Sequence, residues 1–161
     1  VLIAEAAAYA KSRGLTLPEL LDEIFSEFGV YLERGESLTM EGAEGASRIQ
    51  KLVESYAAQP PVEIDGSKVV SIINFALDVV HDVEGDKIPA EAMLMITLED
   101  ARKIAVRPSG TEPKIKYYMF AATKPSAGSR FSPPELEAAK ATATAGLASL
   151  WAFLSADAKA R

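Results

Sequence analysis

The chain has 161 residues and a formal net charge of −6, with hydrophobic residues at 48% and charged residues at 25%. This length and composition are typical of a folded domain with its own core, and the acidic balance argues against a general nucleic-acid-binding protein, which needs an excess of Lys and Arg. The chain contains no cysteine and one histidine, so disulfides, thiol nucleophiles, thiolate metal sites and multi-histidine sites are excluded.

The apolar stretches are far shorter than the roughly 20 residues that a membrane-spanning helix needs. Residues 1–10 include Glu5 and lack the basic leader of a signal peptide. We therefore expect a cytoplasmic protein that has neither a membrane nor a nucleic acid as its partner.

The first 29 residues carry the pattern of two short helices joined by a tight turn. Gly14 is the expected end of the first helix, and Thr16 is the candidate N-cap of the second. The apolar stripe of the second helix consists of Leu20, Leu21, Ile24, Phe25 and Phe28. Because the chain begins inside a helix, we expect residues 1–35 to be a helical connector from the end of a preceding, missing domain.

The rest of the chain alternates between helical and strand periodicity. The expected elements are a strand or extended arm over 30–40, a helix over 41–59, strands over 67–80, 92–99, 102–107 and 114–122, and a helix over 132–160. The expected inner faces of the two later helices are Ile49, Leu52, Val53 and Tyr56, and Leu136, Ala139, Leu147, Leu150, Trp151 and Leu154. This order predicts an α+β domain over residues 36–161, with helices packed on one face of a small, mainly antiparallel sheet.

The segment RPSGTEPKIKYYMF, which starts at Arg107, gathers groups that can bind a phosphate. Arg107 supplies a planar fork of donors, Ser109 and Thr111 supply hydroxyls, and Gly110 lets backbone N–H groups approach an anion. Lys116 can bring a second positive charge to the mouth of the loop. A loop of this composition between two strands is also common as an ordinary polar turn, so the residue types alone leave both interpretations open.

This segment strongly resembles the phosphate-binding loop in the C-terminal domain of the α-D-phosphohexomutases, the superfamily of phosphoglucomutases and phosphomannomutases. The helical start, the helix over 41–59 with its proline end, and the order of the strands are also similar to that family. The resemblance implies that Arg107, Ser109, Gly110 and Thr111 hold the phosphate of a bound sugar. Lys116 stands where many relatives have an arginine, which keeps the charge but loses the bidentate geometry.

The family resemblance also implies a mechanism whose other parts are missing from this sequence. Enzymes of the family carry a phosphoserine in an earlier domain and bind Mg²⁺ on a loop of closely spaced aspartates. They transfer a phosphoryl group to a hexose phosphate through a hexose 1,6-bisphosphate, which serves as intermediate and activator. The chain has neither the phosphoserine motif nor the magnesium loop, so we expect it to be the substrate-phosphate-binding domain of a mutase and to be inactive by itself, with the missing upstream domains and a sugar phosphate as partners.

Several other features allow a weaker functional interpretation. Asp78, Asp82, Glu84 and Asp86 could suggest a metal cluster, but a solvated acidic loop is the preferred reading, and His81 is assigned no role. Tyr117 and Tyr118 point to opposite faces of a strand, so we expect one in the core and one beside the sugar site. The alternative to a mutase domain is a free-standing α+β interaction module without catalytic activity.

Overall fold

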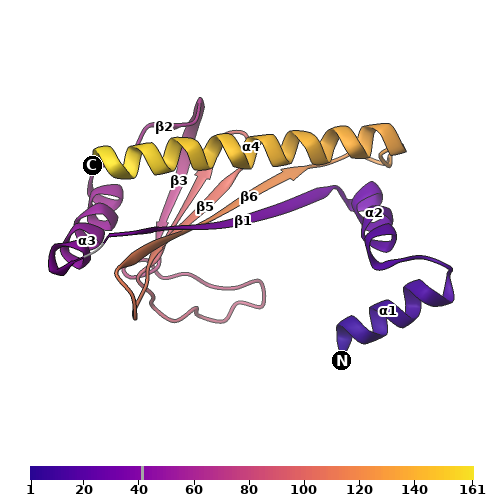
Figure 1. Ribbon diagram of the computed structural model, residues 1–161, viewed down its shortest axis with the longest axis horizontal. Coiled ribbons are helices and arrows are strands. Elements are labelled where there is room, and N and C mark those ends of the chain that lie inside the picture. The colour runs from indigo at the N-terminus through magenta and orange to yellow at the C-terminus, as the bar shows by residue number, and fades with distance from the viewer. Residues whose placement is uncertain (41) are drawn as a thin grey trace. The chain divides into compact units, whose positions relative to one another are not determined.

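The computed structural model describes residues 1–40 and 42–161, so Glu41, the first residue of the helix expected over 41–59, lies outside the described residues. Within this part of the chain the helices are α1 (Leu2–Ser12), α2 (Leu17–Phe28), α3 (Ala43–Ala58) and α4 (Pro133–Ala160) (Figure 1). The strands are β1 (Val30–Thr39), β2 (Glu63–Ile64), β3 (Ser67–Asn74), β4 (Leu94–Leu98), β5 (Lys103–Pro108) and β6 (Lys114–Thr123).

The described chain divides into two compact units. We call Val1–Leu32 with Ala122–Thr144 the helical unit, and Glu33–Ala121 with Ala145–Arg161 the sheet unit. The domain boundary expected after residue 35 stays a prediction.

The strands form one sheet in the order β1-β6-β5-β4-β3-β2. The pairs β2-β3, β3-β4, β4-β5 and β5-β6 are all antiparallel. Asp65 and Gly66 make the turn between β2 and β3, and both have positive φ angles, of 50° and 74°, as a tight hairpin turn requires. Strand β2 is missing from the sequence-based prediction because its two residues are too few to show a period.

Burial in the sheet unit follows the strand period of two. Along β6, Ile115, Tyr117 and Met119 are buried, whereas the residues between them are half exposed. The buried face meets α3 and the second half of α4, where the rings of Tyr117 and Trp151 lie 5.8 Å apart. The prediction of an α+β fold, with a mainly antiparallel sheet and helices on one face, is confirmed.

The strand expected over 67–80 is too long. Strand β3 ends at Asn74, whose side-chain oxygen accepts from the Ala76 N–H at 3.0 Å, while the Asp78 carboxylate accepts from the Asn74 N–H at 2.7 Å. These two local bonds begin a turn, so the pairing with the β4 side continues only through the backbone of Phe75. β-branched residues in the segment that follows therefore do not extend the strand.

The helical unit confirms the expected helical hairpin at the start of the chain. Thr16 is the N-cap of α2 in a capping box, in which the Glu19 carboxylate accepts from the Thr16 N–H at 2.7 Å. Gly29 ends the helix with a φ of 103°, and a Cβ at this position would lie 2.8 Å from the Thr123 carbonyl oxygen. Only a glycine fits both the backbone angle and this close approach.

The apolar stripe expected on α2 is largely solvent-exposed. No residue of α2 is buried, and Leu21, Ile24 and Phe28 are all exposed. The described residues of the helical unit leave this face of the helix uncovered.

Candidate functional site

The loop that the sequence singles out joins β5 to β6 in the sheet unit. Its backbone is closed at the base, where the Ser109 N–H donates to the Lys114 carbonyl at 2.8 Å. The Lys114 N–H donates to the Glu112 carbonyl at 2.7 Å. Residues 109–113 therefore form a short loop on a rigid two-stranded base, which is a suitable support for a binding site.

Arg107 and Lys116 lie directly opposite each other in the antiparallel register of β5 and β6. Opposite residues of such a pair point to the same face of the sheet, with their Cβ atoms about 5 Å apart. Arg107 is exposed and Lys116 is half exposed. The two positive charges thus share one accessible face beside the loop. That they bind a phosphate stays a prediction.

Ser109, Gly110 and Thr111 form the first part of the loop itself. Ser109 is half-buried, and Gly110 and Thr111 are exposed. No neighbouring atom lies within 4 Å of the position that a Cβ on Gly110 would take, so its backbone faces open space. Among the described residues, neither hydroxyl side chain has a hydrogen-bonding partner, which leaves both able to donate to a ligand.

Tyr117 and Tyr118 point to opposite faces, and Tyr117 is the one in the core. Burial raises the pKa of Tyr117 to about 12, so it stays neutral. Tyr118 lies on the same face as Lys116, and its ring is 3.7 Å from the position of a Cβ on Gly35 in β1. That Tyr118 borders a sugar site stays a prediction.

Two carboxylates already accompany the positive charges of the site. Arg107 Nη1 lies 2.7 Å from Glu91 Oε1, and the Lys114 ammonium pairs with the Glu112 carboxylate. The hydrogen bond and charge of Lys114, with a smaller effect of Lys116, hold the pKa of Glu112 below its ordinary value. Glu91 could not be found from the sequence, because it is far from the loop along the chain and nothing in its spacing connects it to Arg107.

No magnesium site fits the described residues, since no group of three or more His, Asp or Glu side chains is placed to hold a metal ion. Within the acidic loop, Asp78 accepts from the Asn74 N–H, and Asp82 Oδ1 accepts from the N–H groups of Glu84 and Asp86, each at 2.9 Å. These carboxylates support turns of the backbone. His81 forms an isolated bridge with Lys87 and is exposed.

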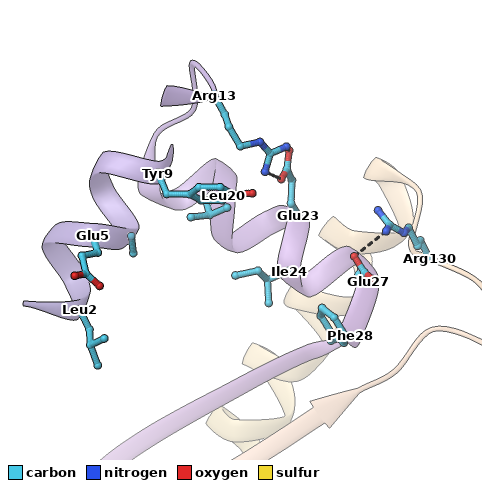
Figure 2. Close-up of a pocket in the computed structure, with 11 residues that line it drawn as sticks. Leu2, Glu5, Tyr9, Arg13, Leu20, Glu23, Ile24, Glu27, Phe28 and Arg130 are labelled. Atoms are coloured by element: carbon cyan, nitrogen blue, oxygen red, sulfur yellow. Dashed lines mark hydrogen bonds and ion pairs between the residues drawn. The ribbon is translucent and has the colours of Figure 1, made fainter. Parts of the chain in front are cut away.

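The helical unit contains a hollow of about 550 Å³ between α1 and α2 (Figure 2). Its rim carries two ion pairs, Arg13 with Glu23 and Arg130 with Glu27, both at 2.7 Å. Apolar side chains such as Ile24 and Phe28 make up much of the remaining wall. Part of the apolar stripe of α2 lines this hollow, but none of the residues expected to bind phosphate does, and its two arginines are already paired.

No protein-family model matches the chain. Phosphoglucomutases from Staphylococcus aureus strains N315, Mu50 and USA300 are each 34% identical to it over 122 residues, which is 73% of this chain and 22% of each relative. The chain is homologous to a segment of the phosphoglucomutases. This confirms the resemblance to the phosphohexomutases that the sequence suggested.

The chain spans only about a fifth of the length of the relatives it matches, so the homology covers one domain-sized part of phosphoglucomutase. Among solved structures, the open form of pp63/parafusin, a phosphoglucomutase from Paramecium, is 14% identical and has a TM-score of 0.40, with 83% of this chain and 22% of that chain covered. A TM-score of this size does not establish a common fold, so the assignment depends on the sequence match. No helix of the described residues is long and apolar enough to cross a membrane.

Proposed function

We propose that this chain is the domain of a phosphoglucomutase- or phosphomannomutase-type enzyme that binds the phosphate of the substrate. The observation that supports this most directly is the placement of Arg107 opposite Lys116, beside a loop that carries the Ser109 and Thr111 hydroxyls, in a chain homologous to a segment of phosphoglucomutase. Arg107 would bind two phosphate oxygens, and Ser109 and Thr111 would donate further hydrogen bonds. Gly110 would present its backbone to the same anion.

In the intact enzyme, phosphoryl transfer between positions of a hexose phosphate would use a phosphoserine and a magnesium site in other segments. The residues of this chain would then bind and orient the phosphate that is not being transferred, and hold it while the other end of the sugar reacts. The helical connector over residues 1–35 would join this domain to the one before it.

The isolated chain should bind weakly. About four charge-assisted hydrogen bonds of roughly 1.5–3 kcal/mol each give a gross 6–12 kcal/mol. Lost motion of the ligand costs about 4 kcal/mol or more, which leaves at most about 2–8 kcal/mol. A millimolar affinity corresponds to about 4 kcal/mol and lies within this range.

The test is an NMR titration of the chain with inorganic phosphate, glucose 1-phosphate and glucose 6-phosphate, following the amide signals of residues 107–116. We expect saturable shifts in this loop and a phosphate affinity that Arg107→Ala lowers by about tenfold or more, since at least one charge-assisted hydrogen bond is lost. Arg130→Ala is a matched control, because Arg130 also forms a 2.7 Å ion pair on the surface but lies outside the loop. Binding that Arg107→Ala leaves intact, or no binding at tens of millimolar ligand, would count against a phosphate site in this chain.

A further inference from the structure

The Glu91 carboxylate forms an ion pair with the Arg107 guanidinium group, on which the proposed phosphate site depends. Its Oε1 lies 2.7 Å from Arg107 Nη1. The carboxylate comes from the long connection between β3 and β4, which is a separate part of the sheet unit from the β5–β6 loop.

The position of Glu91 is determined by backbone bonds at the base of that connection. The Glu91 N–H donates to the Phe75 carbonyl at 3.1 Å, and the Glu91 carbonyl accepts from the Met93 N–H at 2.7 Å. The Phe75 N–H donates in turn to the Met93 carbonyl at 3.0 Å. These bonds continue the pairing of β3 with β4, so the Cα of Glu91 is anchored beside the sheet.

The local charges explain why a carboxylate is favoured at this place when no anion is bound. Arg107 lies directly opposite Lys116, and two like charges in opposite positions of a sheet repel each other. Glu91 neutralises one of the two. Glu112 neutralises Lys114, a third cation near the loop. Arg107 and Lys114 thus each have one carboxylate partner.

The ion pair is also accessible enough to exchange. The side chains of Arg107 and Glu91 are 48% and 41% exposed, so water and a dissolved anion can reach both partners. An exposed pair of this kind is weak, and a dianionic phosphate that brings several acceptor oxygens can replace a single carboxylate oxygen.

We propose that Glu91 is the internal counter-ion of Arg107, and that a phosphate group must displace it to reach the guanidinium. Glu91 thereby lowers the affinity of the loop for phosphate and keeps Arg107 neutralised while the site is empty. This inference rests on the proposed function, because it concerns the same site.

Glu91→Gln tests the inference, since it keeps the size of the side chain and removes its charge. We expect inorganic phosphate to bind Glu91→Gln up to about fivefold more tightly than the wild-type chain, the factor that corresponds to an exposed ion pair of ordinary strength. Glu84→Gln is the matched control, because it removes the same charge from the same connection, and the described residues form no ion pair with Glu84. If Glu91→Gln lost structure, it would bind phosphate more weakly. Tighter binding by this variant therefore cannot come from a loss of structure.

The outcomes separate this inference from the proposed function. If the wild-type chain binds phosphate at residues 107–116 and Glu91→Gln binds no more tightly than Glu84→Gln, Glu91 is not a competitor and the proposed function stands. If Glu91→Gln binds phosphate and the wild-type chain does not, the counter-ion role is supported, whereas phosphate binding by the isolated wild-type chain is contradicted. If neither binds at tens of millimolar phosphate, both proposals are wrong. The double variant Glu91→Gln/Arg107→Ala should lose the gain, and a gain that persists there would overturn the pairing with Arg107.

Discussion

The two units of the chain differ in how far they bury the apolar side chains of their helices. In the sheet unit, Leu150 of α4 is 0% exposed, whereas in the helical unit Leu21 of α2 is 45% exposed. Helix α2 nevertheless has a clear apolar stripe, together with a complete capping box. The difference shows that an amphipathic sequence predicts that a helix has a covering partner, but does not tell where in the protein that partner lies.

The sharpest test of this contrast is the same substitution in both units. Leu150→Ala should lower the free energy of unfolding by about 2–5 kcal/mol, because it leaves a cavity in a packed core. Leu21→Ala should lower it by less than about 1 kcal/mol, because little buried surface is lost. Chemical denaturation followed by circular dichroism measures both.

A control distinguishes a cavity effect from general sensitivity of α4. Leu150→Met nearly conserves the volume of the side chain and should cost less than about 1.5 kcal/mol. Equal losses for Leu21→Ala and Leu150→Ala would contradict the difference between the two units.

The next largest effect is expected for Arg102, which connects three parts of the sheet unit. Its side chain is 13% exposed and donates to Asp65 at 2.6 Å, to Asp100 at 2.8 Å and to the Gly146 carbonyl at 3.2 Å. Removing one partner of a largely buried pair leaves the other charge uncompensated. Arg102→Ala should therefore destabilise the chain by about 3 kcal/mol in the same denaturation experiment.

Arg13 provides the matching substitution in the helical unit. It forms a bidentate pair with Glu23, at 2.7 and 3.1 Å, on an exposed surface. Because water and salt screen such a pair, Arg13→Ala should change stability very little. A loss as large as that of Arg102→Ala would show that the two networks do not differ as their burial suggests.

A third prediction concerns two tyrosines of the sheet-unit core. The Tyr117 hydroxyl is buried near the Tyr56 hydroxyl but makes no well-aligned hydrogen bond among the described residues, whereas Tyr56 donates to Asp157 Oδ2 at 2.8 Å. Tyr117→Phe should leave stability unchanged or raise it by up to about 1 kcal/mol, and Tyr56→Phe should lower it by about 1–2 kcal/mol. The opposite order in thermal unfolding would mean that the Tyr117 hydroxyl makes a stabilising bond.

Much of the fold could be predicted because its signals are local. Thr16 and Glu19 mark the start of α2, and Gly29 directly follows its last residue, so each signal lies next to the helix end that it predicts. The loop that starts at Arg107 could be found in the same way, since its polar groups are adjacent in the sequence and the hairpin brings Lys116 opposite Arg107.

The features that could not be predicted depend on contacts between distant segments or on competing side-chain bonds. Glu91 reaches Arg107, and Tyr56 reaches Asp157, only after the chain has folded. Strand β3 stops at Asn74 because side-chain bonds replace the ladder, although the residues that follow have strand propensity. Residue propensity and sequence spacing show neither the contacts between distant segments nor the side-chain bonds that end a strand.

The smallest expected effect is a dependence of stability on acid pH that comes from two carboxylates of the helical unit, Glu19 in the first turn of α2 and Glu135 in the first turn of α4. Hydrogen bonds from the backbone and hydroxyl of Thr16 hold the pKa of Glu19 below its ordinary value of 4.5, and those from the hydroxyl and backbone of Ser132 do the same for Glu135. A pKa that is lower in the folded state means that folding favours the ionised carboxylate. This contribution is therefore fully present above about pH 4.5 and is lost as the pH falls through the lowered pKa of each group.

The double variant Glu19→Gln/Glu135→Gln isolates this contribution. Its thermal midpoint should lie slightly below that of the wild-type chain at pH 7, and the two midpoints should converge as the pH falls below about 4.5. The midpoints converge because at low pH the wild-type chain loses the stabilisation by its ionised carboxylates, which the variant lacks at every pH. If the midpoints stay equally far apart down to pH 3, the ionised carboxylates do not contribute, and the exposed helix α2 depends on its fixed backbone geometry rather than on its charged cap.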